Sequence, residues 1–289
     1  MNIIFGIISS FLDSITESYR KKAINNARLP DGLIAFFGPL IGLFVIYFLV
    51  ILFGINYNIF YDTNTILLLF GCALIESFGS LLEVKIVKNT KISKIMPYSS
   101  LDKLFVILLG FLFFYGNPGY TSFLTLLISI FTIFLIILFS IDFKNLSIEK
   151  NIKLYIFLKF IYACNILIIG KILFEYSTLD IFALIIFFYI MFNIIINLLL
   201  KKDFTLIFKQ SKIFYKYRFL TAIFGRLSFI IGIYIIESSG VLIASLLSFI
   251  TIVFSVFSMK FILGDSPTPK QISLSILVII MIGIGYYFK

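Results

Sequence analysis

The sequence contains no histidine and only two cysteines, and charged residues occupy just 13% of its 289 positions. Histidine provides the metal ligands and proton relays on which most intramembrane metalloenzymes depend, so its absence argues against an enzyme. Cys72 and Cys164 both fall inside apolar runs. There we expect them to pack as small apolar groups rather than to form a disulfide or bind a metal. We therefore expect no covalent chemistry and no cofactor.

Hydrophobic residues dominate what remains, at 61% of the chain with a mean hydropathy of +1.12. One soluble core cannot bury so much apolar surface, so the composition predicts a polytopic membrane protein. A span needs roughly 20 apolar residues to cross about 30 Å of hydrocarbon, and it must be helical to satisfy its own backbone. We predict an all-α protein with ten transmembrane helices. These predicted spans are residues 3–19, 33–54, 65–84, 95–115, 120–141, 152–173, 178–200, 216–236, 239–260 and 270–288.

Basic residues are concentrated in alternate loops. Nineteen of the 24 lysines and arginines follow the odd-numbered spans, whereas only Lys171 and Lys289 lie on the opposite side. Loop placement accounts for the net charge of +10 better than a nucleic-acid surface does, and we expect no nucleic-acid partner. The positive-inside rule then predicts a multi-pass protein of the cell (inner) membrane with both termini outside the cytoplasm.

Two stretches suggest an internal repeat. "FFYGNPGYTSFLTLLISIFTIFLIIL" (113–138) and "FILGDSPTPKQISLSILVIIMIGIGYY" (261–287) share an apolar run, a Gly-containing turn with proline, and a terminal apolar span. Gly116 and Gly264 are 148 residues apart, which divides the chain into two five-span halves, 1–147 and 148–289. Because five is odd, the halves would enter the membrane in opposite senses, as in many secondary transporters. The alternative is that any two apolar hairpins look alike.

These residues resemble the repeat ends of EamA-like proteins in the drug/metabolite transporter superfamily. "GDSPTPKQ" (264–271) carries the Gly-acid turn with the Thr and Gln that precede the last span, and "GNPG" (116–119) is a weaker copy. The resemblance implies ten helices in two inverted repeats around a central cavity, and transport by alternating access. Described ten-helix members are similar in having both termini in the cytoplasm, whereas the loop charges here predict the opposite.

Charged residues also occur inside the predicted spans, where each acidic or basic side chain costs about 2.5 to 3.5 kcal/mol to insert. The buried acids belong to the first half, and the second half supplies bases, with Lys159 on one helical face with two tyrosines. The resemblance places the first, third, fourth, sixth, eighth and ninth helices around the cavity. The buried charges of this sequence fall on helices in those positions. The residues predicted to bind substrate are Asp13, Glu76, Asp102, Lys103, Tyr155, Lys159, Tyr162 and Arg226.

Two interpretations of Glu76 and Arg226 stay open at this point. They could pair and lock the two halves together, since a buried ion without a partner is costly. They could instead yield to a substrate that carries an amine and a carboxylate, and Glu76 is the candidate for a coupled proton. We expect Glu83, near a span end, to contact water or loop lysines, and Asn165, Asn193 and Asn197 to join helices.

The function predicted from these features is a secondary transporter for a small polar or zwitterionic metabolite, such as an amino acid, a related amine or an organic acid. Its partners would be that substrate, the lipid bilayer and, as a candidate, protons; monomer and homodimer both stay open. The alternatives are an exporter or flippase of an amphiphilic drug or lipid-linked head group, and a non-transporting membrane scaffold whose buried charges only fasten helices.

Overall fold

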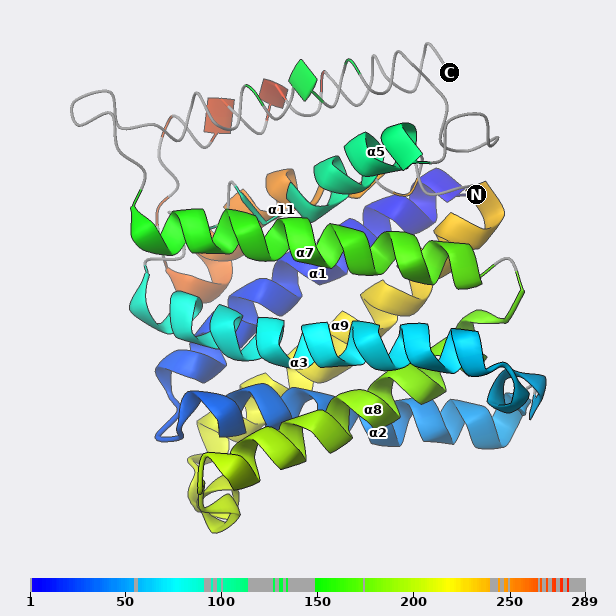
Figure 1. The fold of residues 1–289 in the computed structure, drawn as a ribbon. Helices are drawn as coiled ribbons and strands as arrows, with labels where there is room; N and C mark the ends of the chain where they lie inside the picture. Colours follow the sequence, from blue (N-terminus) through cyan, green and yellow to red (C-terminus); the bar gives the residue numbers. More distant parts are fainter. Residues whose placement is uncertain are drawn as a thin grey trace. The chain divides into compact units, whose positions relative to one another are not determined.

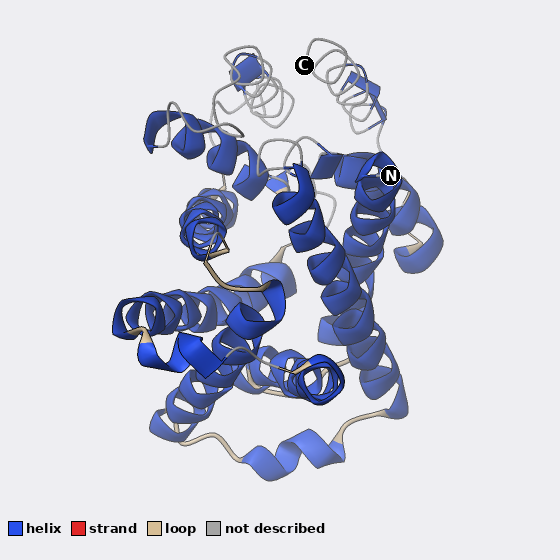
Figure 2. Cartoon of the chain, turned by 90° about the vertical axis from the view of Figure 1, so that its right-hand side faces the viewer, coloured by secondary structure: helices blue, strands red, loops and turns tan. Residues whose placement is uncertain are grey.

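A computed structural model of the chain describes residues 2–113 apart from 55–56, 91–94, 96–97 and 100, and residues 149–239 apart from 174. Beyond these it describes scattered residues and the stretch 250–264. The described residues are helical and contain no strand, as predicted (Figure 1, Figure 2). Most of the predicted spans 120–141 and 270–288, and the motif residues 116–118, 265, 267, 268 and 271, lie outside the described residues.

The helices follow the predicted spans closely. Their bounds are α1 (Asn2–Asn25), α2 (Asp31–Phe53), α3 (Thr63–Asn89), α5 (Leu101–Phe113), α7 (Lys150–Ile172), α8 (Thr178–Leu199), α9 (Lys212–Ser239) and α11 (Ile250–Ser258). Two short 3-10 segments, η1 (Tyr57–Tyr61) and η3 (Phe204–Lys209), lie in connections, and the π-helical turn η4 (Met259–Leu263) follows α11.

Five helices among the described residues are long and apolar enough to cross a membrane, namely α2, α3, α7, α8 and α9. This agrees with the prediction of a helical membrane protein. The count of ten spans and the inverted repeat stay predictions. The fourth predicted span differs, because α5 begins at Leu101 rather than near residue 95. Asp102 thus lies in the first turn of α5, where the helix dipole favours a carboxylate.

Polar residues at the helix ends satisfy backbone groups that the helices leave unpaired. At the start of α8, Ser177 and Asp180 form a capping box, with Asp180 N donating to Ser177 Oγ at 3.3 Å and Ser177 N to Asp180 Oδ2 at 3.2 Å. Asp62 accepts from the backbone N–H of Thr65 at 3.1 Å before α3. Gly54, with φ of 79°, ends α2. These caps fix where the apolar segments stop.

The chain packs as two compact units. Unit 1 consists of Met1–Ser18, Thr90–Leu167 and Leu227–Lys289, and unit 2 of Tyr19–Asn89 and Ile168–Arg226. The unit boundaries fall within α1, α7 and α9. Each unit therefore contains residues from both predicted halves.

In unit 1, serines of α1 hold this helix to segments from the end of the chain. Ser14 Oγ donates to Ser258 Oγ at 2.8 Å, Ser18 Oγ donates to the same atom at 2.9 Å, and Ser10 Oγ donates to Leu247 O at 2.9 Å. Gly6 lets Leu247 approach, because a methyl group on Gly6 would lie 2.6 Å from it. Small residues and hydroxyl bonds of this kind join helices in membranes, where apolar burial provides little drive.

In unit 2, α8 packs on both α2 and α3. Asn193 Nδ2 donates to Ser77 Oγ of α3 at 3.2 Å, and Asn197 Nδ2 donates to Gly32 O of α2 at 3.2 Å. Both asparagines are fully buried. They join helices, as predicted. Asn165 is buried in unit 1.

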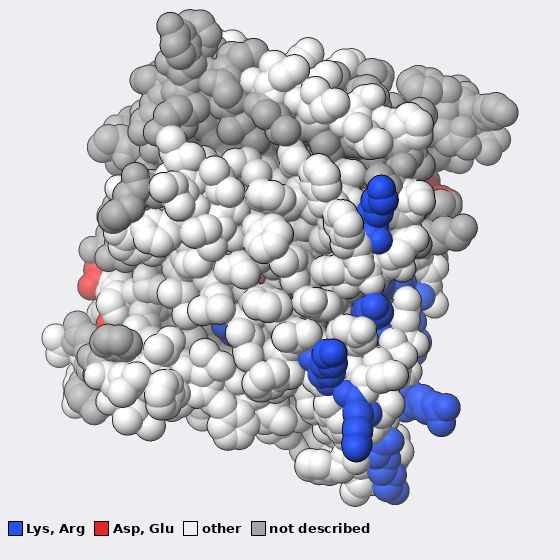
Figure 3. Space-filling view, turned by 180° about the vertical axis from the view of Figure 1, so that it is seen from behind, with Lys and Arg blue, Asp and Glu red and all other residues white. Residues whose placement is uncertain are grey.

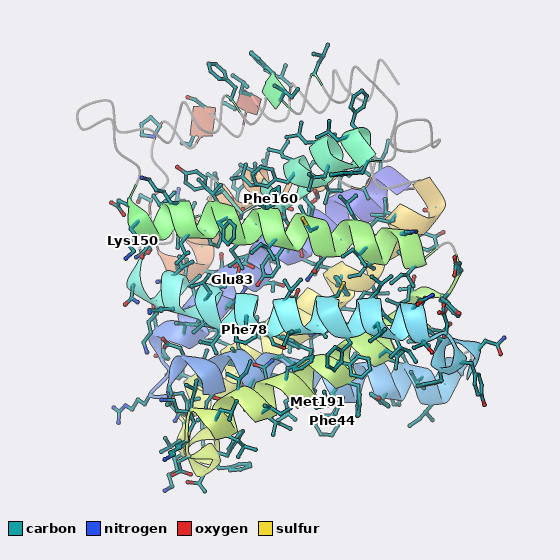
Figure 4. The ribbon with its side chains drawn as sticks, viewed as in Figure 1. Phe44, Phe78, Glu83, Lys150, Phe160 and Met191 are labelled. Carbon is teal, nitrogen blue, oxygen red and sulfur yellow. The ribbon has the colours of Figure 1, made fainter. Side chains whose placement is uncertain are left out.

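Apolar side chains cover outward faces of unit 2. Phe44 on α2 and Phe78 on α3, both labelled in Figure 4, are 69% and 59% exposed. Large aromatic side chains on long apolar helices suit contact with lipid rather than with water.

Basic residues gather at one end of unit 2. This end contains the last turns of α1, α3 and α8, the first turns of α2 and α9, and the segment η3. Two contacts join these elements. Lys88 Nζ lies 3.0 Å from Asp31 Oδ1, and Arg28 N donates to Gln210 Oε1 at 2.9 Å. Figure 3 shows lysines and arginines gathered on one side of the face that it draws. The opposite end of the unit carries Asp62 and Asp180, and Tyr176 Oη donates to Asp62 Oδ2 at 3.2 Å. The basic residues of this end are Arg20, Lys21, Lys22, Arg28, Lys85, Lys88, Lys201, Lys202, Lys209, Lys212, Lys216 and Arg218.

Candidate functional site

Unit 1 brings together six of the eight residues predicted to bind substrate. Asp13 comes from α1, Asp102 and Lys103 from the first turn of α5, and the other three from α7. We call Asp13, Asp102, Lys103, Tyr155, Lys159 and Tyr162 the unit 1 charge cluster.

Packing of α5 against α7 sets the position of this cluster. Val106 of α5 joins Ala163 and Leu167 of α7 in one buried apolar group. Phe105 of α5 packs edge to face on Phe160 of α7, labelled in Figure 4, with ring centroids 5.5 Å apart. These contacts fix the first turn of α5 beside the middle of α7.

Lys159 lies between two aromatic rings of its own helix. Its Nζ is 5.2 Å from the centroid of Tyr155 and 5.6 Å from that of Tyr162. The rings stand four residues before and three after the lysine, so all three side chains share one face of α7. Lys159 is only 7% exposed, and the negative ring faces help to stabilise its ammonium group there. The shared face was predicted from this spacing.

Carboxylates surround this lysine on the other helices. Lys103 Nζ lies 3.3 Å from Asp102 Oδ2. Asp102 and Asp13 each interact electrostatically with both Lys103 and Lys159. Ser228 of α9 lies within hydrogen-bonding range of Asp13. The cluster therefore combines two carboxylates with two ammonium groups, and their formal charges balance.

One acceptor in the cluster is unused. Asp102 is 8% exposed, and its Oδ1 has no hydrogen-bond partner among the residues that the structure describes. Buried carboxylate oxygens are normally satisfied, so an orphaned one points to a missing donor. An amine of a bound molecule would supply such a donor.

Glu76 and Arg226, the remaining two predicted residues, lie in unit 2. Arg226 on α9 interacts electrostatically with Glu76 on α3 and with Tyr189 on α8. A methyl group on Gly42 of α2 would lie 2.5 Å from Arg226 Nε, so only glycine leaves room for this guanidinium. Glu76 and Arg226 are partly exposed, although both belong to long apolar helices.

The basic end of unit 2 contains buried charges that the sequence interpretation assigned to solvent. Arg20 Nη2 lies 2.7 Å from Glu83 Oε2, and this glutamate is buried rather than in contact with water. Arg218, counted among the loop charges, is 4% exposed inside α9 and donates through Nη2 to Ile34 O at 2.5 Å. Thr221, Ala222 and Arg218 follow the spacing of one small-residue helix face, which is the signal that could have placed Arg218 inside.

Neither cysteine forms a disulfide, and Cys72 is buried. Within the described residues, no group of three or more histidine, cysteine, aspartate or glutamate side chains could hold a metal ion.

Comparison with known proteins shows a fold shared with solved structures. No protein-family model matches the chain, and no curated protein matches it. Among solved structures, 24 chains match. One of them, described as "Crystal structure of protein", is 9% identical, covers 99% of this chain and 96% of its own, and has a TM-score of 0.71. At this identity the likeness shows the fold alone.

Proposed function

We propose that the chain is a secondary transporter that moves a small polar or zwitterionic metabolite across the cell membrane by alternating access, in the manner of EamA-like members of the drug/metabolite transporter superfamily. The observation that carries the proposal is the unit 1 charge cluster. It places two acids and two bases on α1, α5 and α7 of a strongly apolar chain, within predicted spans where charge is expensive to keep.

The cluster suits a ligand that carries both signs of charge. Lys159, backed by two tyrosine rings, can hold a carboxylate, and Asp102, with its unused oxygen, can accept from an amine. Amino acids and related amines or organic acids have these groups within a few bonds of each other. The formal charges of the cluster balance, so its acids and bases can neutralise each other when no substrate is bound.

Glu76 is our candidate for a coupled proton. Its carboxylate lies within electrostatic range of Arg226. A change in the distance or the solvation of this pair would therefore alter proton binding at Glu76. Glu76→Gln is expected to abolish proton-driven accumulation while leaving substrate exchange. Proton-driven uptake that persists in vesicles containing this variant would reject the assignment.

The competing function is a membrane scaffold, and the contact between Lys103 and Asp102 favours it, because neighbouring side chains already neutralise each other. Flux through proteoliposomes separates the two functions. We expect saturable movement of one class from a panel of amino acids, choline-like cations and organic acids, and its loss in Lys159→Gln.

The matched control is Lys171→Gln, which removes an exposed lysine from the last turn of the same helix. This variant should transport as the wild type does. Equal flux in both variants, or no saturable flux of any class in the wild type, would contradict the transport proposal and support the scaffold.

A further inference from the structure

Arg218 in unit 2 is a buried cation that forms no ion pair with a carboxylate in the described part of the chain. Its Nη2 donates to Ile34 O, and its Nε has no hydrogen-bond partner among the described residues. At neutral pH the charged group of the described chain that acts on it is Arg20, which has the same sign. Arg20 itself forms an ion pair with Glu83, with Nη2 2.7 Å from Oε2.

This arrangement is unfavourable for the protein alone. A guanidinium has five N–H donors, and one backbone carbonyl satisfies only part of that capacity. Burying a cation is costly unless an anion or several acceptors compensate for the lost water. Among the described residues Arg218 has neither, although its side chain is buried.

The guanidinium of Arg218 comes close to the backbone of α2. A methyl group on Gly38 would lie 2.9 Å from Arg218 Nη2. About one turn further along α2, a methyl group on Gly42 would lie 2.5 Å from Arg226 Nε. Two arginines of α9 therefore approach α2 at glycine positions.

More bases lie at the same end of unit 2. Lys21 is buried and donates to Val87 O, and Lys22 Nζ lies 5.0 Å from the ring centroid of Tyr217. We propose that Arg218, with Arg20 beside it, forms a buried binding site for an oxyanion, a carboxylate or phosphate group, at the basic end of unit 2. The guanidinium fork matches such groups better than an ammonium does, which explains why arginine occupies this position.

The oxyanion can come from a soluble molecule or from the head group of an anionic lipid. This inference goes beyond the proposed function, and it holds whether or not the chain transports anything. The site is distinct from the unit 1 charge cluster in its residues.

The test uses the purified full-length chain and its thermal unfolding. Inorganic phosphate is titrated against chloride at constant ionic strength in detergent, and separately the protein is placed in nanodiscs of phosphatidylglycerol or phosphatidylcholine. A ligand that binds the folded state raises the melting temperature in a saturable way. We expect such a rise with phosphate if the ligand is soluble, or with phosphatidylglycerol alone if it is a lipid.

Two variants of Arg218 and one control complete the experiment. Arg218→Gln should lose the response, and Arg218→Lys should weaken the apparent affinity at least tenfold because it keeps the charge without the fork. Lys216→Gln, an exposed neighbour on α9, should respond as the wild type does. No saturable response of the wild type to phosphate or phosphatidylglycerol would overturn the proposal, whatever the variants do. So would equal responses in wild type and Arg218→Gln.

Discussion

Replacing Gly32 with alanine tests how closely α2 and α8 approach. A methyl group on Gly32 would lie 2.4 Å from Asn197 Oδ1 and 3.2 Å from its Cγ. Asn197 cannot swing away freely, because its Nδ2 donates to Gly32 O at 3.2 Å and to Asn193 O at 2.8 Å. The substitution therefore either strains the helix pair or breaks these bonds.

The expected loss follows from those two outcomes. Overpacking of a tight contact costs about 1–3 kcal/mol, and each hydrogen bond between membrane helices contributes about 0.6 kcal/mol. A loss of about 2 kcal/mol corresponds to a melting temperature roughly 4–8 °C lower in a chain of this size class. Circular dichroism of the purified protein during heating in detergent measures this change.

Gly71→Ala provides the matched control, because no atom of the described residues lies within 4 Å of the methyl group that it adds to α3. It should be neutral or slightly stabilising, since alanine favours a helix by roughly 0.5–1 kcal/mol over glycine. Combining Gly32→Ala with Asn197→Ala should cost less than the sum of the single changes, because the second removes the atom that the first meets. Strict additivity, or equal effects of the two glycine substitutions, would refute the contact.

Three further predictions concern charged residues. Hydrogen bonds, chiefly from the side chain of Thr65, hold the pKa of Asp62 below its ordinary value of 3.8. The stability that the ionised Asp62 contributes is present above pH 3.8 and is lost as pH falls through the lowered pKa, so melting temperatures of wild type and Asp62→Asn should converge in acid. Glu83→Gln should destabilise the protein by about 3 kcal/mol in thermal unfolding, because it removes one member of a buried ion pair. If the basic end of unit 2 faces the cytoplasm, a cysteine at position 175 is outside the cell and one at position 209 is inside. In a background without native cysteines, an impermeant maleimide applied to intact cells should therefore label Glu175→Cys but not Lys209→Cys. The reverse labelling pattern would show the opposite orientation.

Helix positions were predictable because the bilayer sets their length. The predicted span 178–200 corresponds to α8 at Thr178–Leu199, and the capping residues Ser177 and Asp180 stand at its start. Where polar residues interrupt an apolar run, the prediction was less accurate. The predicted span 95–115 included residues before Leu101, although α5 begins there and uses Asp102 in its first turn.

The sequence predicted which site residues share a face of one helix, but not which residues of different helices lie together. Spacing alone placed Tyr155, Lys159 and Tyr162 on one face of α7, and their contacts confirm it. That Asp13 would interact with Lys159 depends on which helices pack together, and one sequence contains no such information. The burial of Arg218 was missed for a related reason, because counting charges near a span end does not show which side chains turn inward.

Variants that change the charge balance of the unit 1 cluster can distinguish a structural role from a binding role. If the charges only fasten helices, neutralising Lys159 leaves excess negative charge buried, and the protein should lose stability that a second change at Asp102 restores. If the cluster binds substrate, the same double change would restore stability but not flux, because no charges remain for the ligand to replace. Stability and flux therefore have to be measured on the same double variant, since either alone is compatible with both roles.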